Sequence, residues 1–184
     1  MKTLIEFYGP ASSGKTTMMY AIASKLSMAG LKVTTLEESI RQLKFDIAAE
    51  LSRDNGRSMQ FSILQKQVEN ITQKLSEADI VICDRSIYDF IIYVGIYMGK
   101  GEFYDVYKAF VPAIYTALGV ENHYIFELTS VGFENDGLRH SPNYAFECTE
   151  FRNGASDYTH AIKIAVPTTN HDERIKIIME NLKC

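Results

Sequence analysis

Residues 9–16 carry the sequence GPASSGKT, and this stretch decides the fold. It has the spacing G-x-x-x-x-G-K-[ST], with Gly9 and Gly14 as the two glycines and Lys15 and Thr16 directly after them. Glycine adopts backbone angles that are closed to other residues, so such a loop can turn successive N–H groups toward one phosphate. A helix that begins at about Gly14 adds the positive end of its dipole. The stretch therefore predicts a phosphate-binding loop.

The residues on either side of the loop support this prediction. Residues 3–8 (TLIEFY) have the length and composition of a β-strand. After the loop, apolar residues recur at helical spacing: Met18, Ile22, Leu26 and Ala29. A strand, the loop and a helix in this order are the context that the motif requires. An ordinary glycine-containing turn between strand and helix is the alternative, and it leaves the Lys-Thr pair unexplained.

The motif assigns a role to each of its polar residues. Lys15 can reach the β- and γ-phosphates of a nucleotide, and the Thr16 hydroxyl can bind Mg²⁺. The residues expected to contact the nucleotide are Gly9, Ala11, Ser12, Ser13, Gly14, Lys15, Thr16 and Thr17. ATP and Mg²⁺ are therefore the expected cofactors.

The composition indicates one ordinary globular domain. The chain has 184 residues, enough for a single well-packed core, and we expect one domain over residues 1–184. Hydrophobic residues make up 46% and charged residues 23%. A net charge of −4 argues against a broad basic surface for duplex DNA, although a local basic cleft leaves nucleic acid open as a substrate.

The three cysteines and the absence of a long apolar run indicate where the protein works. Cys83, Cys148 and Cys184 are odd in number and widely spaced, which favours a reducing compartment. Cys83 ends an apolar strand and is interpreted as a core residue. No apolar run approaches about 20 residues. We expect a soluble cytoplasmic protein without a membrane partner; its oligomeric state stays open.

Strands and helices alternate along the chain. The predicted strands are residues 3–8, 31–36, 80–83, 124–128 and 161–166. The predicted helices follow the loop and cover residues 39–51, 58–75, 86–97, 103–118, a stretch that ends near 154, and 174–182. This alternation predicts an α/β fold with a five-stranded parallel sheet and helices on both faces.

Charged residues follow the second and third predicted strands. Ligands of such sheets bind beyond the carboxyl ends of the strands, so these residues face the phosphate loop. Asp84 and Glu38 can each bind Mg²⁺ or accept the proton of an attacking hydroxyl. Asp84 can instead cap the next helix, and the neighbouring Glu37 is interpreted as a partner of a helix dipole. The choice of base between Asp84 and Glu38 stays open.

Further candidates lie around these carboxylates. Arg41 and Arg85 are candidate substrate clamps, although Arg85 can also be a surface charge. Tyr88 belongs to an aromatic cluster in two adjacent helices, where most rings are core residues; it is the candidate for stacking on a base.

A polar segment at about 129–154 has the composition of a lid. Within it, Asp136 is a candidate substrate ligand, and Arg139 is a candidate catalytic residue that closes over the phosphates. His140 and Arg152 are equally compatible with an ordinary surface loop.

The chain resembles the P-loop kinases of the nucleoside and nucleotide kinase group, and most closely their ribosylnicotinamide kinase-like branch. Five features carry the resemblance in order: GPASSGKTT, the E-x-x-R pattern from Glu38 to Arg41, Gln60 with Gln67, the D-R-x-x-x-D-x-x-x-Y pattern from Asp84 to Tyr93, and residues 136–139. The resemblance implies a P-loop NTPase fold in three layers, with the first strand beside the third. It also implies that Mg-ATP phosphorylates a hydroxyl of a nucleoside-like molecule. The end of the third strand, Asp-Arg-Ser, departs from the Asp-Thr-Asp associated with that branch.

Three functions agree with these observations. The first is a kinase that transfers phosphate from ATP to a hydroxyl of a nucleoside or nucleotide. The second is a kinase whose acceptor hydroxyl belongs to DNA, either on a hydroxymethylated pyrimidine or at a polynucleotide end. The third is a regulatory NTPase or nucleotide-binding module without an acceptor. A screen of acceptors distinguishes them.

Overall fold

Five parallel strands form the centre of the protein. The computed structural model describes residues 1–10, 12–37, 56–130, 148–151 and 161–183. The strands in these residues are β1 (Thr3–Tyr8), β2 (Val33–Leu36), β3 (Ile80–Cys83), β4 (Asn122–Leu128) and β5 (Ile162–Val166). They pair in the order β2-β3-β1-β4-β5, and every neighbouring pair is parallel. The predicted sheet is confirmed, including the first strand beside the third.

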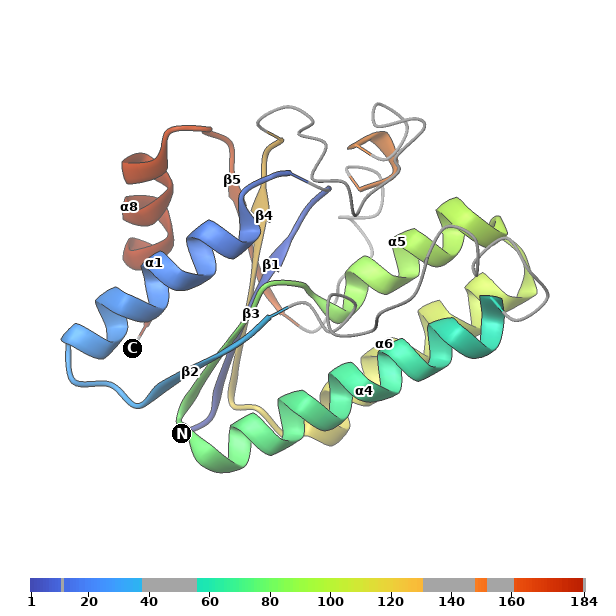
Figure 1. The fold of residues 1–184 in the computed structure, drawn as a ribbon, viewed down its shortest axis with the longest axis horizontal. Helices are drawn as coiled ribbons and strands as arrows, with labels where there is room; N and C mark the ends of the chain where they lie inside the picture. The colour runs from blue at the N-terminus through green and yellow to red at the C-terminus, as the bar shows by residue number, and fades with distance from the viewer. Residues whose placement is uncertain (11, 38–55, 131–147, 152–160, 184) are drawn as a thin grey trace.

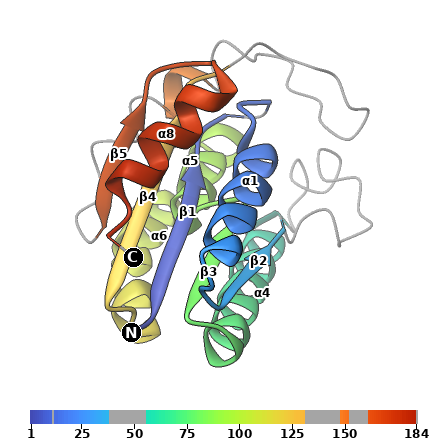
Figure 2. The same cartoon turned by 90° about the vertical axis from the view of Figure 1, so that its left-hand side faces the viewer.

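Helices cover both faces of this sheet (Figure 1). On one face lie α1 (Lys15–Met28) and α8 (His171–Asn181). On the other face lie α4 (Gly56–Glu77), α5 (Ile87–Met98) and α6 (Glu102–Leu118). Figure 2 shows the same arrangement from the side, with α1 and α8 in front of the sheet and α4, α5 and α6 behind it. The three-layer α/β fold is therefore confirmed. None of the helices in the described residues is both long and apolar enough to cross a membrane.

The central strand contributes to two separate cores. Ile5 and Phe7 pack with residues of α1 and α8, while Leu4 and Tyr8 pack under α4, α5 and α6. Successive strand residues point to opposite faces, so a strand covered on both sides is apolar almost throughout. Glu6 is the charged residue in this strand, and it is fully buried in the middle of β1.

The order of the strands brings two loops together. β1 lies between β3 and β4; β2 lies beyond β3, and β5 lies beyond β4. The residue pair Glu6 and Cys83 is in register between β1 and β3, and the N–H of Ser86 donates to the carbonyl of Phe7 at 3.1 Å. The chain that leaves β3 therefore runs beside the loop that leaves β1, at the switch point where ligands of such sheets bind.

Most predicted bounds agree with the structure. β1 and β3 have the predicted limits, and Cys83 is a fully buried core residue. The final helix begins at His171 rather than Arg174, because Asn170 Oδ1 caps it by accepting from the N–H of Glu173 at 3.0 Å. The helix predicted at 39–51 lies outside the described residues. Of the helix predicted to end near 154, residues 148–151 are described and are helical.

Candidate active site

The loop between β1 and α1 has the backbone that its glycines predict. The φ angle is +149° at Gly9, +55° at Ser12 and +85° at Gly14. A Cβ atom on Gly9 would lie 2.8 Å from the carbonyl oxygen of Leu128, so the loop passes the end of β4 without room for a side chain. Such successive turns gather N–H groups into a concave anion-binding nest. Gly14 then begins α1 as its N-cap, which adds the helix dipole.

Lys15 lies over this loop and is buried. Its ammonium donates to the carbonyl oxygens of Gly9 at 2.7 Å and Pro10 at 2.6 Å, and to Ser13 Oγ at 3.3 Å. Each partner belongs to the loop itself, so one positive charge is held against the loop. The role of Lys15 in binding the β- and γ-phosphates stays a prediction.

Thr16 and Asp84 meet across the two adjacent loops. The Thr16 hydroxyl donates to Asp84 Oδ2 at 2.6 Å, and the Asp84 carboxylate is 2% exposed. The alternative interpretation of Asp84 as a helix cap is wrong, because Ser86 is the N-cap of α5 and its Oγ accepts from the N–H of Tyr88 at 3.1 Å. The carboxylate of Asp84 is instead directed to the phosphate loop.

The oxygen atoms of Thr16 and Asp84 fit a magnesium ion. Mg²⁺ prefers hard oxygen ligands, and it is commonly held by one or two protein groups together with substrate phosphates and water. Within the described residues no group of three or more His, Cys, Asp or Glu side chains can hold a metal ion by itself. The Thr16 hydroxyl and the Asp84 carboxylate together supply two hard oxygen ligands.

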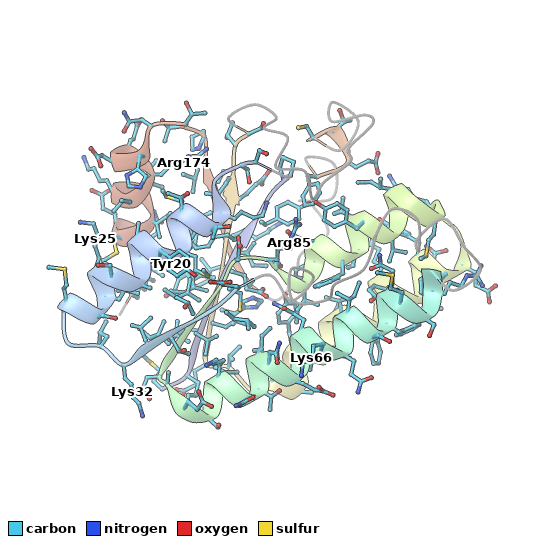
Figure 3. The ribbon with its side chains drawn as sticks, in the orientation of Figure 1. Tyr20, Lys25, Lys32, Lys66, Arg85 and Arg174 are labelled. Carbon is cyan, nitrogen blue, oxygen red and sulfur yellow. The ribbon has the colours of Figure 1, made fainter. Side chains whose placement is uncertain are left out.

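Arg85, which lies just before α5, forms a cluster with Asp89 and Tyr93 on one face of that helix. Arg85 Nη1 lies 3.3 Å from Asp89 Oδ2 and 3.1 Å from the Tyr93 hydroxyl, and the guanidinium carbon lies 4.9 Å from the centroid of the Tyr93 ring. Arg85 and Asp89 are both buried. The spacing R-x-x-x-D-x-x-x-Y is thus the helical spacing of three side chains in contact. Arg85 is therefore not a surface charge, and Figure 3 shows it near the start of α5.

Tyr88 is enclosed in the core. Its side chain is 1% exposed, and its ring stacks on Tyr115 with centroids 5.2 Å apart. Burial, together with the nearby charge of Glu6, raises the pKa of Tyr88 to about 12. This burial favours the core alternative that the sequence left open for the aromatic cluster, and the structure gives no support to the stacking of Tyr88 on a base.

A buried network around Glu6 was missed by the sequence patterns. Glu6 Oε2 accepts from the Tyr115 hydroxyl at 2.6 Å and from His123 Nε2 at 2.8 Å. Ser86 Oγ donates to the same oxygen at 3.3 Å, and the N–H of Ile87 donates to Oε1 at 3.2 Å. Glu6 thereby binds the first residues of α5, directly after Asp84 and Arg85. The available signal was a carboxylate in an apolar strand.

Phe151 attaches the described end of the lid-like segment to the site. Its carbonyl oxygen accepts from the Tyr8 hydroxyl at 2.5 Å, and its ring lies 5.1 Å from the ring of Tyr8 and 5.4 Å from that of Tyr93. The neighbouring Glu150 forms an ion pair with Lys100 at 2.7 Å. Residues 148–151 therefore contact both the strand that precedes the phosphate loop and the tyrosine that binds Arg85.

Arg174 is a second residue that the sequence patterns missed. It lies on α8, is 2% exposed, and its Nη1 donates to the carbonyl oxygen of Ser13 in the phosphate loop at 2.7 Å. A lone arginine in a predicted helix gives no signal of this contact, because the two residues are 161 positions apart.

The remaining candidates fall into two groups. Ser12, Ser13 and Thr17 lie in the loop and the first turn of α1, where the motif places them. The candidates outside the described residues are Ala11, Glu38, Arg41, Asp136 and Arg139. The roles given to this second group stay predictions.

A comparison with protein families decides where the chain belongs. A family model described as "AAA domain" matches residues 4–174. The chain belongs to the AAA domain family. This is a family of P-loop NTPases, so the phosphate loop deduced from GPASSGKT agrees with the family as a whole.

Curated relatives of this AAA domain protein include two thymidylate kinases. That of Latilactobacillus sakei subsp. sakei (strain 23K) is 32% identical over 110 residues, which cover 54% of the chain and 51% of the relative. That of Staphylococcus haemolyticus (strain JCSC1435) is 31% identical over 108 residues, 55% of the chain and 53% of the relative. The matched part thus spans about half the length of these relatives. The placement in the ribosylnicotinamide kinase-like branch stays a prediction.

Solved structures share the whole fold of this AAA domain protein. Deoxyadenosine kinase from M. mycoides with bound dATP aligns over 100% of both chains with a TM-score of 0.61 and 14% identity. Thymidylate kinase from Ehrlichia chaffeensis aligns over 99% of this chain and 100% of its own, with a TM-score of 0.56 and 20% identity. At these identities the likeness establishes the fold alone.

Proposed function

We propose that the protein transfers the γ-phosphoryl group of ATP to a nucleoside or a nucleotide. The observation that carries this proposal is the 2.6 Å bond between Thr16 and Asp84, beside Lys15 in the phosphate loop. A cation, an anion-binding nest and a carboxylate–hydroxyl pair are the groups that phosphoryl transfer needs, since it depends on positioning and on neutralising charge.

Each group of the site has a part in this reaction. The loop amides and Lys15 bind the β- and γ-phosphates, and Thr16 and Asp84 hold Mg²⁺. When it is bound, Mg²⁺ neutralises charge on the transferring phosphate. Arg139 is proposed to close over the phosphates from the lid-like segment at about 129–154.

The bond to Thr16 also bears on the choice of base. An Asp84 oxygen that accepts the Thr16 hydroxyl is directed to the metal position, which supports a metal role for Asp84. We therefore propose Glu38 as the general base that accepts the proton of the acceptor hydroxyl. Glu38 follows β2 in the chain, and β2 pairs with β3, the strand that precedes Asp84. Arg41, Arg85 and Asp136 are proposed to contact the acceptor.

The relatives support a nucleoside or nucleotide as the acceptor. Proteins named thymidylate kinase share about a third of their aligned residues with this chain, and a deoxyadenosine kinase shares its fold. The cluster of Arg85, Asp89 and Tyr93 adds a buried guanidinium directly after Asp84. A guanidinium there can bind phosphate or a hydroxyl of the acceptor.

A screen of acceptors tests the proposal. The protein is incubated with Mg-ATP and with a panel of deoxynucleosides, ribonucleosides and their monophosphates, and the products are identified by mass spectrometry. We expect one group of acceptors to gain a phosphate and the Lys15→Met variant to lose this activity. Lys25→Met is the matched control, because Lys25 is an exposed lysine of the same helix.

Two additions to this screen test the other two functions: DNA offered as an acceptor of labelled phosphate, and ATP hydrolysis measured with and without acceptors. Labelled phosphate transferred only to DNA would establish a polymer kinase. Rapid ATP hydrolysis that no added acceptor changes would establish an NTPase. Either result overturns the small-molecule kinase.

A further inference from the structure

Arg174 joins three separate segments of the chain. Its guanidinium donates to the carbonyl oxygens of Ser13 (Nη1, 2.7 Å), Thr129 (Nη2, 2.6 Å) and Thr168 (Nε, 2.7 Å). These oxygens belong to the phosphate loop, to the residue after β4 and to the chain between β5 and α8. Figure 3 shows Arg174 on α8, across the sheet from Arg85. One side chain thus connects the phosphate loop to the segments that follow β4 and β5.

The chemistry of this contact requires an arginine. A buried cation is costly unless hydrogen bonds replace its water, and three carbonyl oxygens do so here. Burial lowers the pKa of Arg174, but an arginine keeps its proton in proteins. A guanidinium presents its donors in a fixed planar fork, whereas a lysine ammonium is a single point that cannot reach three separated acceptors in this way.

The bond to the Ser13 carbonyl determines the orientation of the peptide group that joins Ser13 to Gly14. In a planar trans peptide, the C=O and the following N–H point to opposite sides, and the described chain has no cis peptide bond. When Arg174 holds the Ser13 carbonyl on the α8 side, the N–H of Gly14 is turned away from α8. A Cβ added to Gly14 would lie only 3.0 Å from Arg174 Nη1, so the guanidinium occupies the space where a side chain at position 14 would begin.

We propose that Arg174 is a positioning residue for the phosphate loop: by holding the Ser13 carbonyl, it aims the Gly14 N–H at the phosphate chain of the bound nucleotide. The inference rests on the proposed function, because it takes the loop to be the nucleotide site. Arg174 acts through the backbone and does not itself contact the nucleotide. A clamp that only stabilises the fold is the competing explanation, and it predicts a loss of stability without a change in affinity.

Two variants and a control separate these explanations. Arg174→Lys keeps the charge, Arg174→Met removes it, and Lys176→Met removes an exposed charge from the same helix. The affinity for ATP and for tripolyphosphate, which lacks a base and a sugar, is measured by calorimetry where circular dichroism shows each protein folded. We expect Arg174→Lys to bind tripolyphosphate about 10-fold more weakly than wild type, and Arg174→Met at least as weakly, as for one lost charge-assisted hydrogen bond. Lys176→Met should match wild type.

Affinities equal to wild type in both folded variants would overturn the role of Arg174 and leave the proposed function standing. A wild-type protein that binds neither ATP nor tripolyphosphate overturns both. A measurement on the wild type keeps the inference testable even if the variants fail to fold. In ¹⁵N-labelled protein, the Gly14 amide proton should shift downfield when tripolyphosphate is added. A Gly14 signal that stays in place while other loop amides move contradicts the inference.

Discussion

The hydroxyl of Thr16 and the carboxylate of Asp84 lie 2.6 Å apart, although the two residues are 68 positions apart in the chain. The contact exists because β1 and β3 are neighbours in the sheet, so the loops at their carboxyl ends run side by side. Asp84 is buried there, while Thr16 is only partly buried. A hydroxyl and a carboxylate in this arrangement leave oxygen atoms for a cation beside the phosphate loop.

Replacing Asp84 with asparagine should reduce phosphoryl transfer by about 100-fold, because it removes the negative charge but keeps the shape of the side chain. The measurement is the rate at increasing Mg²⁺ concentration, where the variant should need more Mg²⁺ to reach its maximum. Asp79→Asn is the control, since Asp79 is an exposed carboxylate just before the same strand. An unchanged Mg²⁺ dependence for Asp84→Asn would contradict the metal role.

Gly9→Ala should destabilise the protein by about 1–3 kcal/mol, since its backbone angle is strained for alanine. The added Cβ would also meet the Leu128 carbonyl at 2.8 Å, and backbone cannot move aside cheaply. Urea unfolding gives the free energy of unfolding. Gly101→Ala is the matched control, because nothing lies within 4 Å of a Cβ there and its φ of −133° suits alanine. Equal stabilities of the two variants would argue against the close passage of the loop past β4.

Glu6→Leu should cost at least about 2 kcal/mol of unfolding free energy, because several buried donors lose their acceptor. Those donors include Tyr115 and His123 from the α6 and β4 side and the N–H of Ile87 at the start of α5. The exposed carboxylate Glu121 provides the control variant Glu121→Gln. A Glu6→Leu protein as stable as this control would show that the network contributes little.

The buried tyrosines should make the protein less stable in alkali. Burial and the charge of Glu6 raise the pKa of Tyr88 to about 12 and also raise the pKa of Tyr115. The folded state therefore holds these protons more tightly than the unfolded state, in which the pKa is about 10. The resulting stability is complete below pH of about 10 and is lost as the pH rises toward 12, by up to about 1.4 kcal/mol per pH unit for each group.

Urea unfolding at a series of pH values from neutral to strongly alkaline measures this loss. Tyr88→Phe should show a smaller slope of unfolding free energy against pH than wild type. Met28→Leu, which changes an exposed residue of α1 and removes no tyrosine, should keep the wild-type slope. The linkage is refuted if both variants and the wild type share one slope.

Local patterns were sufficient for most of the fold. The limits of β1 and β3, the long helix α4 and the loop between β1 and α1 follow from residues that lie close together in the chain. Apolar periodicity and the angles open to glycine act over a few residues, so one stretch of sequence contains their whole cause. The start of α8 was misplaced because the Asn170 cap was overlooked, and that signal too is local.

The sequence alone determined that GPASSGKT forms a glycine-containing loop between a strand and a helix, because backbone freedom and hydrogen-bond spacing are properties of the local chain. Only the tertiary structure decided which distant groups meet that loop. Asp84 reaches Thr16 through the pairing of β1 with β3, and Arg174 reaches Ser13 through the packing of α8 against α1. Glu6 finds its donors on α5, α6 and β4 in the same way. These contacts depend on strand order and on burial of both sheet faces, which the whole chain determines together.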